Sequence, residues 1–474
     1  MTMRSRRVSG RRHAIGAFTL ALLLAIGACT GGDGTGAPGA TGAAEPPGDI
    51  VVASGRDVTG RGGIRQQLID EWNRRQAGKG HQARLVELSG SADEQRSQLL
   101  GALQSGSAEY DVVNLDVTWV PEFAEADLVQ PLPDELVDGD VIESVAATAR
   151  WDGRVYAVPF NSDVGLLYYR HDYLKKAGVT DTDLSKVTRW SEIQQLIDTL
   201  DDAGGKVPES YEKGWTTQLD ASYEGLTVNG IEAFASAGDD FSLTDANGRY
   251  AGSAADLEAG LDELRNRAQA PYTLGDAVHS DEARSLTDFA DGRTAFLRHW
   301  PYAYGSLHQT LSDQQLGVAP LPGRAVLGGQ NLAVTRASKR SATAQRLIEF
   351  LTSTESERCL LDAGFAATRV SAYEDDGLAC ESVKPPGAAG PTPSASGETT
   401  DRMPRDANGR PAYARTILLP ALRNAVQRPR TPLYGAFTQT FAAELGKLFG
   451  DGPPSDAQLA KSLNEKLAKA LPHG

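Results

Sequence analysis

The feature that most constrains the fold of this chain is a regular alternation of apolar runs with helical patterns after residue 48. Runs typical of buried strands occur at Asp49–Ala53, Arg84–Leu88 and Asp111–Leu115. Apolar residues at helical spacing lie between them, around Leu68 and Leu99. Strands that alternate with helices favour parallel pairing through crossover helices. The pattern therefore predicts the α/β class, with an open sheet.

The pattern changes after residue 150. Trp151–Pro159 contains an Asp-Gly turn signal and predicts a hairpin whose second arm ends at Pro159. Gly165–Arg170 and Leu327–Val334 predict two further strands, and residues 410–471 predict a helical tail. Ligands of open α/β sheets bind beyond the carboxyl ends of the strands. This rule directs attention to the polar residues that follow each predicted strand.

The first 48 residues begin with the composition of an export segment. Five arginines precede Ala14–Ile26, an almost wholly apolar run. A membrane-spanning helix needs about 20 residues, so this shorter run predicts an export signal, residues 1–28, that is cleaved. Small residues precede Cys29 as in a bacterial lipobox, which implies cleavage before Cys29 and attachment of a lipid such as palmitate to its sulfur. An ordinary signal peptide with an incidental cysteine is the alternative.

Residues 29–48 predict a flexible tether. They are mostly Gly, Ala, Thr and Pro, with too little apolar bulk to pack. The expected location is the extracellular face of the cell membrane, with a globular part held by a lipid anchor at Cys29.

The size and charge of the chain limit its domain organisation and its partners. A chain of 474 residues exceeds the usual size of one core, so two domains are expected. The formal net charge is −15, and removal of the arginine-rich signal makes the mature protein more acidic. No stripe of Lys or Arg offsets this charge, so nucleic-acid binding is not expected. Residues 384–401, rich in Pro, Gly, Ser and Thr, predict a disordered loop.

Two cysteines remain after Cys29. Cys359 and Cys380 form an even pair in an exported chain, a setting in which disulfides are common. The sequence predicts a disulfide between them, worth about 3 kcal/mol if it is unstrained. Two separate buried thiols are the alternative.

Signatures of catalysis, metal binding and cofactor binding are missing from the sequence. It contains no G-x-S-x-G elbow, no Walker loop and no H-E-x-x-H motif, and its seven histidines do not pair at metal-ligand spacing. Polar and aromatic residues instead lie at the ends of predicted elements, including Asp116, Trp119, Asn161, Asp163 and Trp300. Sugars need hydrogen-bonding groups for their hydroxyls and aromatic rings for their C–H faces. The pattern favours sugar binding, with no metal and no cofactor.

Four stretches, within a similarity that covers nearly all of residues 49–450, carry a family resemblance. They are Asp111–Trp119 with Glu122–Ala126, Leu166–Arg170, Gly328–Val334 and Arg428–Tyr434. The chain resembles the extracellular solute-binding proteins of sugar ABC importers, family 1, and within them the actinobacterial branch of trehalose-binding lipoproteins. The resemblance implies a periplasmic-binding-protein-like type II fold, in which a hinge joins two α/β lobes with a ligand cleft between them. It implies lobe 1 at 49–162 and 330–372, lobe 2 at 163–329 and 402–474, and hinge strands near Phe160–Asp163 and Gly328–Gln330.

The same resemblance implies six ligand-binding residues, which are Asp116, Asp163, Glu282, Trp300, Gly329 and Arg428. Asp116 would accept sugar hydroxyls from lobe 1, and Trp300 would stack beneath a pyranose ring. The Glu and the Arg would bind hydroxyls from lobe 2, and the glycine would offer backbone groups at the hinge. Asp163 stands where the trehalose binders have Asn, and a carboxylate cannot donate as an amide does. The ligand pose of that branch therefore does not transfer unchanged.

The expected function is that of a substrate-binding lipoprotein of an ABC sugar importer, not of an enzyme. The protein would bind a di- or oligosaccharide, trehalose or another α-glucoside, close over it and deliver it to the transmembrane permease subunits. A monomer is expected. The alternatives are a secreted carbohydrate-active enzyme and a receptor of the same fold for a non-sugar solute such as a peptide, a polyamine or an osmolyte.

Overall fold

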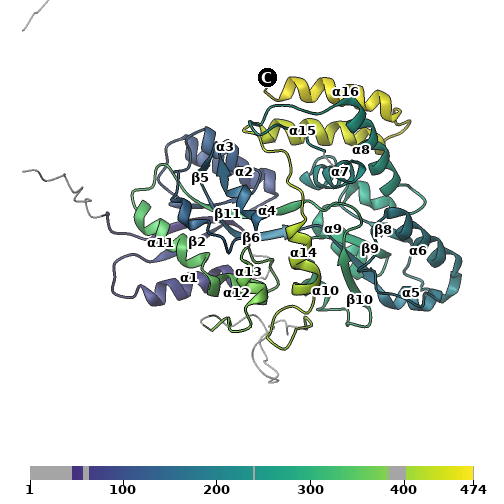
Figure 1. Cartoon of the computed structure of the whole chain (residues 1–474), viewed down its shortest axis with the longest axis horizontal. Helices are drawn as coiled ribbons and strands as arrows, with labels where there is room; N and C mark the ends of the chain where they lie inside the picture. The colour runs from purple at the N-terminus through teal and green to yellow at the C-terminus, as the bar shows by residue number, and fades with distance from the viewer. Residues whose placement is uncertain (1–44, 57–62, 239–240, 382, 384–401, 473–474) are drawn as a thin grey trace, which may run out of the picture. The chain divides into compact units, whose positions relative to one another are not determined.

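The computed structural model describes residues 45–56, 63–238, 241–381, 383 and 402–472 of the chain. The signal at 1–28, the lipid attachment at Cys29, most of the tether and the loop at 384–401 lie outside the described residues. The described residues belong to one compact unit, Glu45–Gly474. Two main sheets organise this unit (Figure 1).

The first sheet has five strands in the order β2-β1-β3-β11-β6. β1 (Ile50–Gly55) pairs in parallel with β2 (Ala83–Leu88) and β3 (Val112–Asp116), as the sequence predicts. β11 (Leu327–Val334) lies between β3 and β6 (Val158–Val164), antiparallel to both. We call this sheet and its helices lobe 1. These helices are α1 (Ile64–Arg75), α2 (Ala92–Gln104), α3 (Val120–Glu125), α4 (Glu143–Ala146), α11 (Ser341–Leu351), α12 (Thr354–Asp362) and α13 (Val370–Glu374).

The second sheet has four strands in the order β10-β7-β9-β8. β7 (Leu166–Arg170) is antiparallel to β9 (Thr294–His299) and β10 (Leu316–Pro320), and β8 (Lys213–Thr216) is parallel to β9. We call this sheet and its helices lobe 2. The C-terminal helices α15 and α16 belong to it, since they pack against α7 and α8 (Figure 1). The helices of lobe 2 are α5 (His171–Ala177), α6 (Trp190–Asp202), α7 (Glu224–Ala237), α8 (Ala254–Arg267), α9 (Glu282–Ala290), α10 (Tyr302–Leu307), α15 (Tyr434–Leu445) and α16 (Asp456–Ala470).

The chain passes between the lobes at two neighbouring points. Gly165 alone separates β6 from β7, and residues 321–326 separate β10 from β11. β6 and β11 pair with each other there, with Asp163 opposite Gly328. A third passage runs through α14 (Leu419–Arg423), which packs against β6 and α4 (Figure 1). The two segments predicted as hinges are thus adjacent strands.

Buried aromatic and aliphatic side chains hold each sheet to its helices. In lobe 1, Ile64, Leu68 and Trp72 lie on the buried face of α1, which confirms the helix predicted from their spacing. In lobe 2, Trp190 of α6 meets Trp215 of β8 edge to face, with ring centroids 4.5 Å apart.

The prediction that a hairpin arm ends at Pro159 is wrong. β4 (Arg150–Trp151) and β5 (Arg154–Val155) form the hairpin around the Asp-Gly turn, but Pro159 is the second residue of β6. It lies opposite Asn331, beside an irregularity in the register. A proline is tolerated there because β6 is an edge strand and the missing N–H leaves no ladder bond broken. Asp163 consequently lies within a strand and not in a loop.

The predicted helical tail is interrupted. α14 is preceded by a π-helical turn at Ala414–Leu418, and α15 and α16 follow, but residues 424–433 are not helical. This non-helical segment carries Arg428 between the two lobes.

The segment before β1 is fixed to lobe 1 earlier than the sequence predicts. Glu45 accepts hydrogen bonds from the backbone N–H groups of Ala342 at 2.7 Å and Thr343 at 3.2 Å. A carboxylate at the first turn of a helix is favourable because the N–H groups there lack partners. The tether predicted to run through residue 48 therefore extends too far.

Cys359 of α12 and Cys380 form a disulfide bond, the pairing that the sequence predicts.

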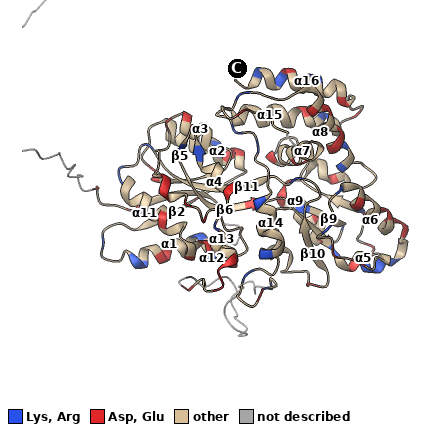
Figure 2. Ribbon diagram, in the orientation of Figure 1, with Lys and Arg blue, Asp and Glu red and all other residues tan. Residues whose placement is uncertain are grey.

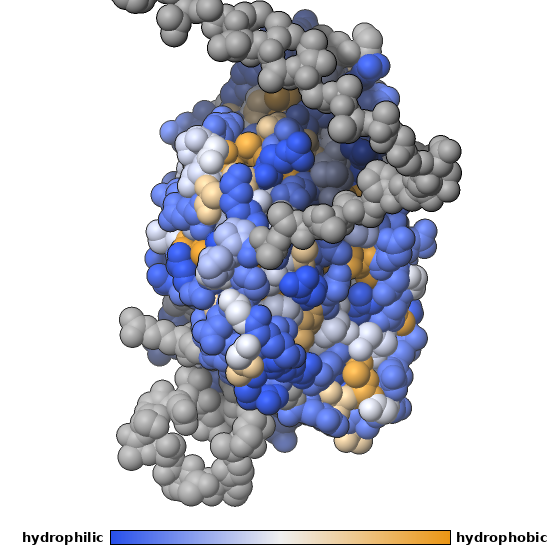
Figure 3. Space-filling model, turned by 90° about the vertical axis from the view of Figure 1, so that its left-hand side faces the viewer, coloured by the Kyte–Doolittle hydropathy of each residue, from blue (hydrophilic) through white to orange (hydrophobic). Residues whose placement is uncertain are grey.

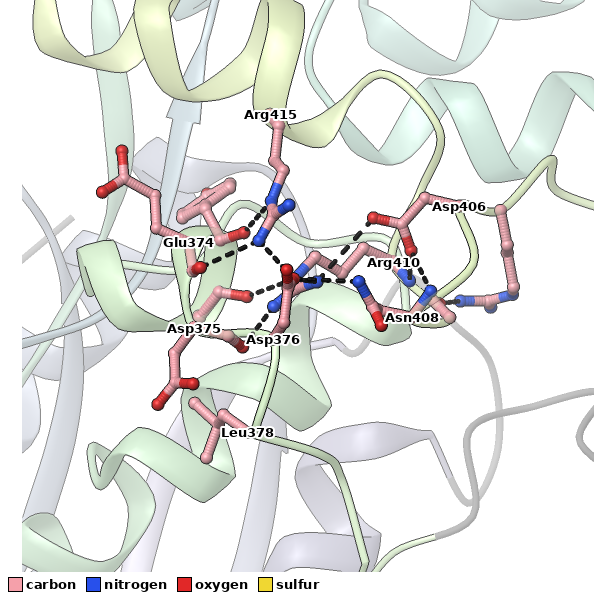
Figure 4. A network of polar contacts seen from close by, with 12 residues as sticks. Glu374, Asp375, Asp376, Leu378, Asp406, Asn408, Arg410 and Arg415 are labelled. Atoms are coloured by element: carbon pink, nitrogen blue, oxygen red, sulfur yellow. Dashed lines mark hydrogen bonds and ion pairs between the residues drawn. The ribbon is translucent and has the colours of Figure 1, made fainter.

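Two arginines of the segment 406–415 are hydrogen-bonded to α13 and to the residues that follow it (Figure 4). Arg410 donates Nε to the carbonyl of Ala372 at 2.9 Å and Nη1 to Asp376 at 3.0 Å. Arg415 donates Nη2 to the carbonyl of Glu374 at 2.8 Å. Both arginines thus satisfy carbonyls at the end of α13.

We expect Arg410→Ala to lower the free energy of unfolding by about 2–3 kcal/mol, because it leaves a buried carbonyl without a donor. The Arg410 side chain is 0% exposed, whereas that of Arg415 is 37% exposed. Arg415→Ala is therefore the matched control, and its unfolding midpoint in urea should shift less. Equal shifts for the two variants would contradict this ranking.

The surface carries both signs of charge. Acidic and basic residues are spread over the helices of both lobes (Figure 2). The face in Figure 3, where it is not covered by grey atoms, is mostly hydrophilic with small scattered apolar groups. Among the described residues, no helix has the length and apolar character to cross a membrane. In the same part of the chain, no group of three or more His, Cys, Asp or Glu residues is arranged to hold a metal ion.

Candidate ligand-binding site

A buried arginine links the two lobes. Arg428 donates Nη2 to both carboxylate oxygens of Asp116, at 2.9 and 3.1 Å, and Nη1 to Glu224 at 2.9 Å. Asp116 ends β3 in lobe 1, and Glu224 begins α7 in lobe 2. The arginine side chain is only 3% exposed. The structure brings together Asp116 and Arg428, two of the six predicted residues, and adds Glu224, which the sequence analysis missed.

Charge and burial oppose each other in this triad. Burial raises the pKa of Glu224, although Arg428 and the hydroxyls of Tyr434 and Thr438 act to lower it. Burial alone would lower the pKa of Arg428, but Asp116 and Glu224 raise it above its usual value. Arg428 is therefore a permanent cation between two carboxylates from different lobes.

Trp300, directly after β9, lies against a second carboxylate. Its Nε1 donates to Glu282 at 3.1 Å, and the Tyr223 hydroxyl donates to the other oxygen of Glu282. Burial raises the pKa of Glu282, and the Trp300 hydrogen bond opposes the rise. The guanidinium of Arg298 lies 3.8 Å from the centre of the Trp300 ring. One face of the indole is thus covered, and a ligand can stack only on the other.

Asp163 faces the same small space as Trp300. A Cβ added to Gly328 would lie 3.1 Å from Cβ of Asp163 and 3.2 Å from Cζ3 of Trp300. Within the described residues the Asp163 carboxyl has no hydrogen-bond or ion-pair partner. Burial raises its pKa to about 7, and Arg65 counteracts this while Asp116 adds to it. Near neutral pH this carboxyl can therefore either donate or accept.

Gly329 occupies a position that only glycine fits. Its φ of 111° lies in the left-handed region, and an added Cβ would meet the carbonyl oxygen of Asn161 at 2.4 Å. Its own carbonyl accepts from the N–H of Val117 at 3.1 Å. This carbonyl, one of the backbone groups predicted for the ligand, is therefore already paired within the protein.

A row of polar side chains crosses lobe 1 beside these groups. In the sheet register, Gln330 of β11 lies opposite Asp116 of β3 and opposite Asn161 of β6. Arg65 of α1 is hydrogen-bonded to both amides of this row. Gln330 directly follows the predicted Gly329, so its position in the sequence could have indicated a place in the site. The sequence does not indicate this for Arg65, because a basic residue on an amphipathic helix normally faces solvent.

A cavity of about 290 Å³ adjoins the Arg428 segment. Residues from α7, from 241–246 and from 426–430 line it, and Arg428 is the one predicted ligand residue among them. The cavity therefore lies beside the groups described above and does not contain Asp163, Glu282 or Trp300.

Comparison with known proteins identifies the family. The model of a family described as bacterial extracellular solute-binding protein matches residues 57–358. The chain belongs to this family. Its curated relatives include the "Probable ABC transporter-binding protein" of Deinococcus radiodurans, 27% identical over 319 residues, which are 65% of this chain and 73% of the relative. They also include the "Probable amino-acid ABC transporter periplasmic-binding protein y4oP" of Sinorhizobium fredii, 26% identical over 301 residues, which are 61% and 66% of the two chains.

A solved structure shows the fold of this solute-binding protein. The chain is similar to "Maltose bound T. maritima MalE3", with a TM-score of 0.71 and 23% identity over 89% of this chain and 100% of that one. The predicted type II fold of periplasmic binding proteins is therefore confirmed, as is the solute-binding family. The trehalose-binding branch stays a prediction.

Proposed function

We propose that this solute-binding protein is the receptor of an ABC sugar importer and binds a di- or oligosaccharide between its lobes. The family supports a solute receptor, and Trp300 with its neighbouring carboxylates carries the sugar proposal. An indole face packs against the C–H face of a pyranose ring, and Asp163 and Glu282 can accept hydrogen bonds from hydroxyls at the ring edge. Trehalose or another α-glucoside is the proposed ligand, bound by the six residues that the sequence predicts.

The proposed mechanism is a shift between open and closed lobes. A ligand that contacts groups from both lobes favours the closed state, since the open state cannot make both sets of contacts. The permease would then receive the ligand from the closed receptor. A lipid on Cys29 would hold this monomer at the extracellular face of the membrane. We propose no catalytic step, so incubation with α-glucosides should return them unaltered.

We expect Trp300→Ala to weaken binding of the best ligand at least tenfold, equivalent to about 1.4 kcal/mol. The ligand is first identified by thermal shift with a sugar panel, because a ligand of the native state raises the unfolding temperature. Affinity is then measured by calorimetry. Trp300→Phe keeps an aromatic face, although a smaller one, and loses the N–H to Glu282, so its loss of affinity should be smaller than that of Trp300→Ala. Unchanged affinity in Trp300→Ala would exclude this ring from the site.

A cationic solute is the second candidate, because Asp163 and Glu282 have no ion-pair partner within the described part of the chain. The size of the pH dependence separates the two ligand classes. A cation requires ionised Asp163, so its affinity should increase as pH rises through about 7. A sugar hydroxyl can hydrogen-bond to Asp163 in either protonation state, so the affinity of a neutral sugar should change much less over the same range. The panel therefore includes basic amino acids and polyamines, each measured at pH values of about 6 and about 8.

A further inference from the structure

Four hydrogen bonds fix the guanidinium of Arg65 beneath the polar row of lobe 1. Nη1 donates to the Ser54 hydroxyl and to the carbonyl of Gly55, both at 3.1 Å. Nη2 donates to Oδ1 of Asn161 at 3.1 Å and to Oε1 of Gln330 at 2.8 Å. The residue is 5% exposed. A guanidinium only donates, so each atom that meets these four N–H bonds must be an acceptor.

This donor set determines which way the two amides point. An Asn or Gln side chain carries its carbonyl and its NH₂ on opposite arms of one plane. With the Asn161 and Gln330 oxygens turned to Arg65, their NH₂ groups point away from it. Asn114 reinforces the arrangement, because its Nδ2 also donates to the Gln330 oxygen, at 2.6 Å. If the oxygen and nitrogen of the Gln330 amide were exchanged, its NH₂ would face the N–H groups of Arg65 and Asn114, which are both donors.

The two NH₂ groups are available to a ligand. Neither amide nitrogen has a hydrogen-bond partner among the described residues. A buried side-chain nitrogen without a partner would count among the buried unsatisfied polar atoms, and neither of these nitrogens does. Both therefore reach accessible space. Asn161 as a whole is only 3% exposed, so its NH₂ group opens onto a small accessible space. An acceptor oxygen of a ligand placed in that space can take up the donor.

The amides belong to the proposed ligand site by their place in the sheet. Asn161 and Asp163 are two residues apart on β6, so they lie on the same face of the strand. Gln330 is opposite Asp116, which binds Arg428. The NH₂ groups of Asn161 and Gln330 therefore lie near the carboxylates of Asp163 and Asp116. Lobe 1 thus offers a ligand hydrogen-bond donors as well as acceptors.

We propose that Arg65 is a positioning residue, which turns the Asn161 and Gln330 amides so that their NH₂ groups donate to oxygen atoms of the bound solute. The proposal rests on the proposed function, because it takes the ligand to be a saccharide. It adds a rule for ligand specificity. The part of the ligand that contacts lobe 1 has one hydroxyl that donates a hydrogen bond to Asp163 or Asp116, and next to it oxygen atoms that accept hydrogen bonds from the two amides. A group that can only donate is disfavoured at that position.

The decisive variants are Gln330→Glu and Asn161→Asp. Each keeps an oxygen toward Arg65, and so keeps the internal contact, but replaces the NH₂ donor by a second acceptor. We expect each to weaken binding of maltose or trehalose, whichever the wild type binds, at least tenfold by calorimetry, with an unfolding temperature close to that of the wild type. Gln66→Glu adds the same charge beside Arg65, and Gln66 pairs with Asp70 of its own helix. This control should bind like the wild type.

A second measurement separates positioning from simple support of the fold. Arg65→Met should also weaken binding at least tenfold, and in the Gln330→Glu background it should add less than about a threefold further loss, since contacts within one network are not additive. If both carboxylate variants bind like the wild type, the proposal is overturned while the sugar receptor stands. If the wild type binds no saccharide, the proposed function itself fails. Should Arg65→Met not fold, the carboxylate variants still decide the question.

Discussion

Replacing Glu232 by glutamine is expected to lower the free energy of unfolding by about 3–5 kcal/mol, because it breaks a fully buried ion pair. Glu232 of α7 accepts from Arg298 of β9 through Nη2 at 2.6 Å and Nε at 3.0 Å, and each side chain is 1% exposed. Without the carboxylate, the guanidinium would be a buried charge with no counter-ion in direct contact. The free energy of unfolding from urea titration is the measurement.

The position of this pair explains why the effect should reach two of the three connections between the lobes, those from β6 to β7 and from β10 to β11. Oε1 of Glu232 also accepts from the N–H of Val326, at 3.1 Å, just before β11. At Gly165, between β6 and β7, an added Cβ would lie 2.2 Å from Glu232 Oε1 and 2.9 Å from Arg298 Nη2. The Glu232–Arg298 ion pair therefore contacts the chain at Gly165 and at Val326, in two of the segments that join the lobes. Arg298 also lies against the Trp300 ring.

Two controls make this expectation specific. Asp134→Asn breaks the Arg150–Asp134 pair, whose side chains are 37% and 68% exposed respectively, and should change the stability by less than about 1 kcal/mol. Replacing Glu232 and Arg298 together by methionine should recover much of the loss, since an apolar pair leaves no charge buried. A Glu232→Gln variant as stable as the wild type would show that water reaches Arg298 in solution.

The local elements of the fold could be predicted from the sequence, but the pairing of its strands could not. The apolar run at 49–53 and the helical spacing around Leu68 reflect short-range periodicity, and both elements form where they were predicted. The place of β11 between β3 and β6 depends on contacts more than 150 residues apart along the chain. The prediction for Pro159 is wrong for the same reason, because a proline ends a strand only where its N–H would have a partner.

The candidate site was predicted in part. The structure brings Trp300 together with Glu282, and Asp116 together with Arg428, while the ligand-binding roles of these four residues stay predictions. Glu224 and Arg65 were missed because nothing in a single sequence marks a charged residue on a helix as buried. Their burial follows from partners on distant segments, Arg428 for the glutamate and the β6–β11 pair for the arginine. Charge balance in the site is therefore a property of the fold and not of local sequence.

Arg428→Ala is expected to weaken ligand binding at least tenfold and also to lower the free energy of unfolding by about 3–5 kcal/mol. The arginine is the cation between Asp116 of lobe 1 and Glu224 of lobe 2, so its loss leaves two carboxylates facing each other without compensation. Arg428→Lys keeps the charge but not the two-sided fork, so its losses should be intermediate. Affinity is measured by calorimetry below the unfolding temperature of each variant, which separates a binding defect from partial unfolding.

The pH dependence of that loss tests whether charge is its cause. Burial already raises the pKa of Glu224, and removal of the cation should raise it further. A carboxyl whose pKa is raised on folding destabilises the protein above its unfolded pKa, and this cost disappears when the group is protonated. The penalty of Arg428→Ala should therefore be larger at a pH of about 8 than at about 5. Arg430→Ala, two residues away, removes an arginine that has no carboxylate partner among the described residues. Its effect comes from the lost hydrogen bond to the Arg150 carbonyl and should not depend on pH. A pH-independent penalty in Arg428→Ala as well would mean that packing, and not the carboxylate triad, holds this segment between the lobes.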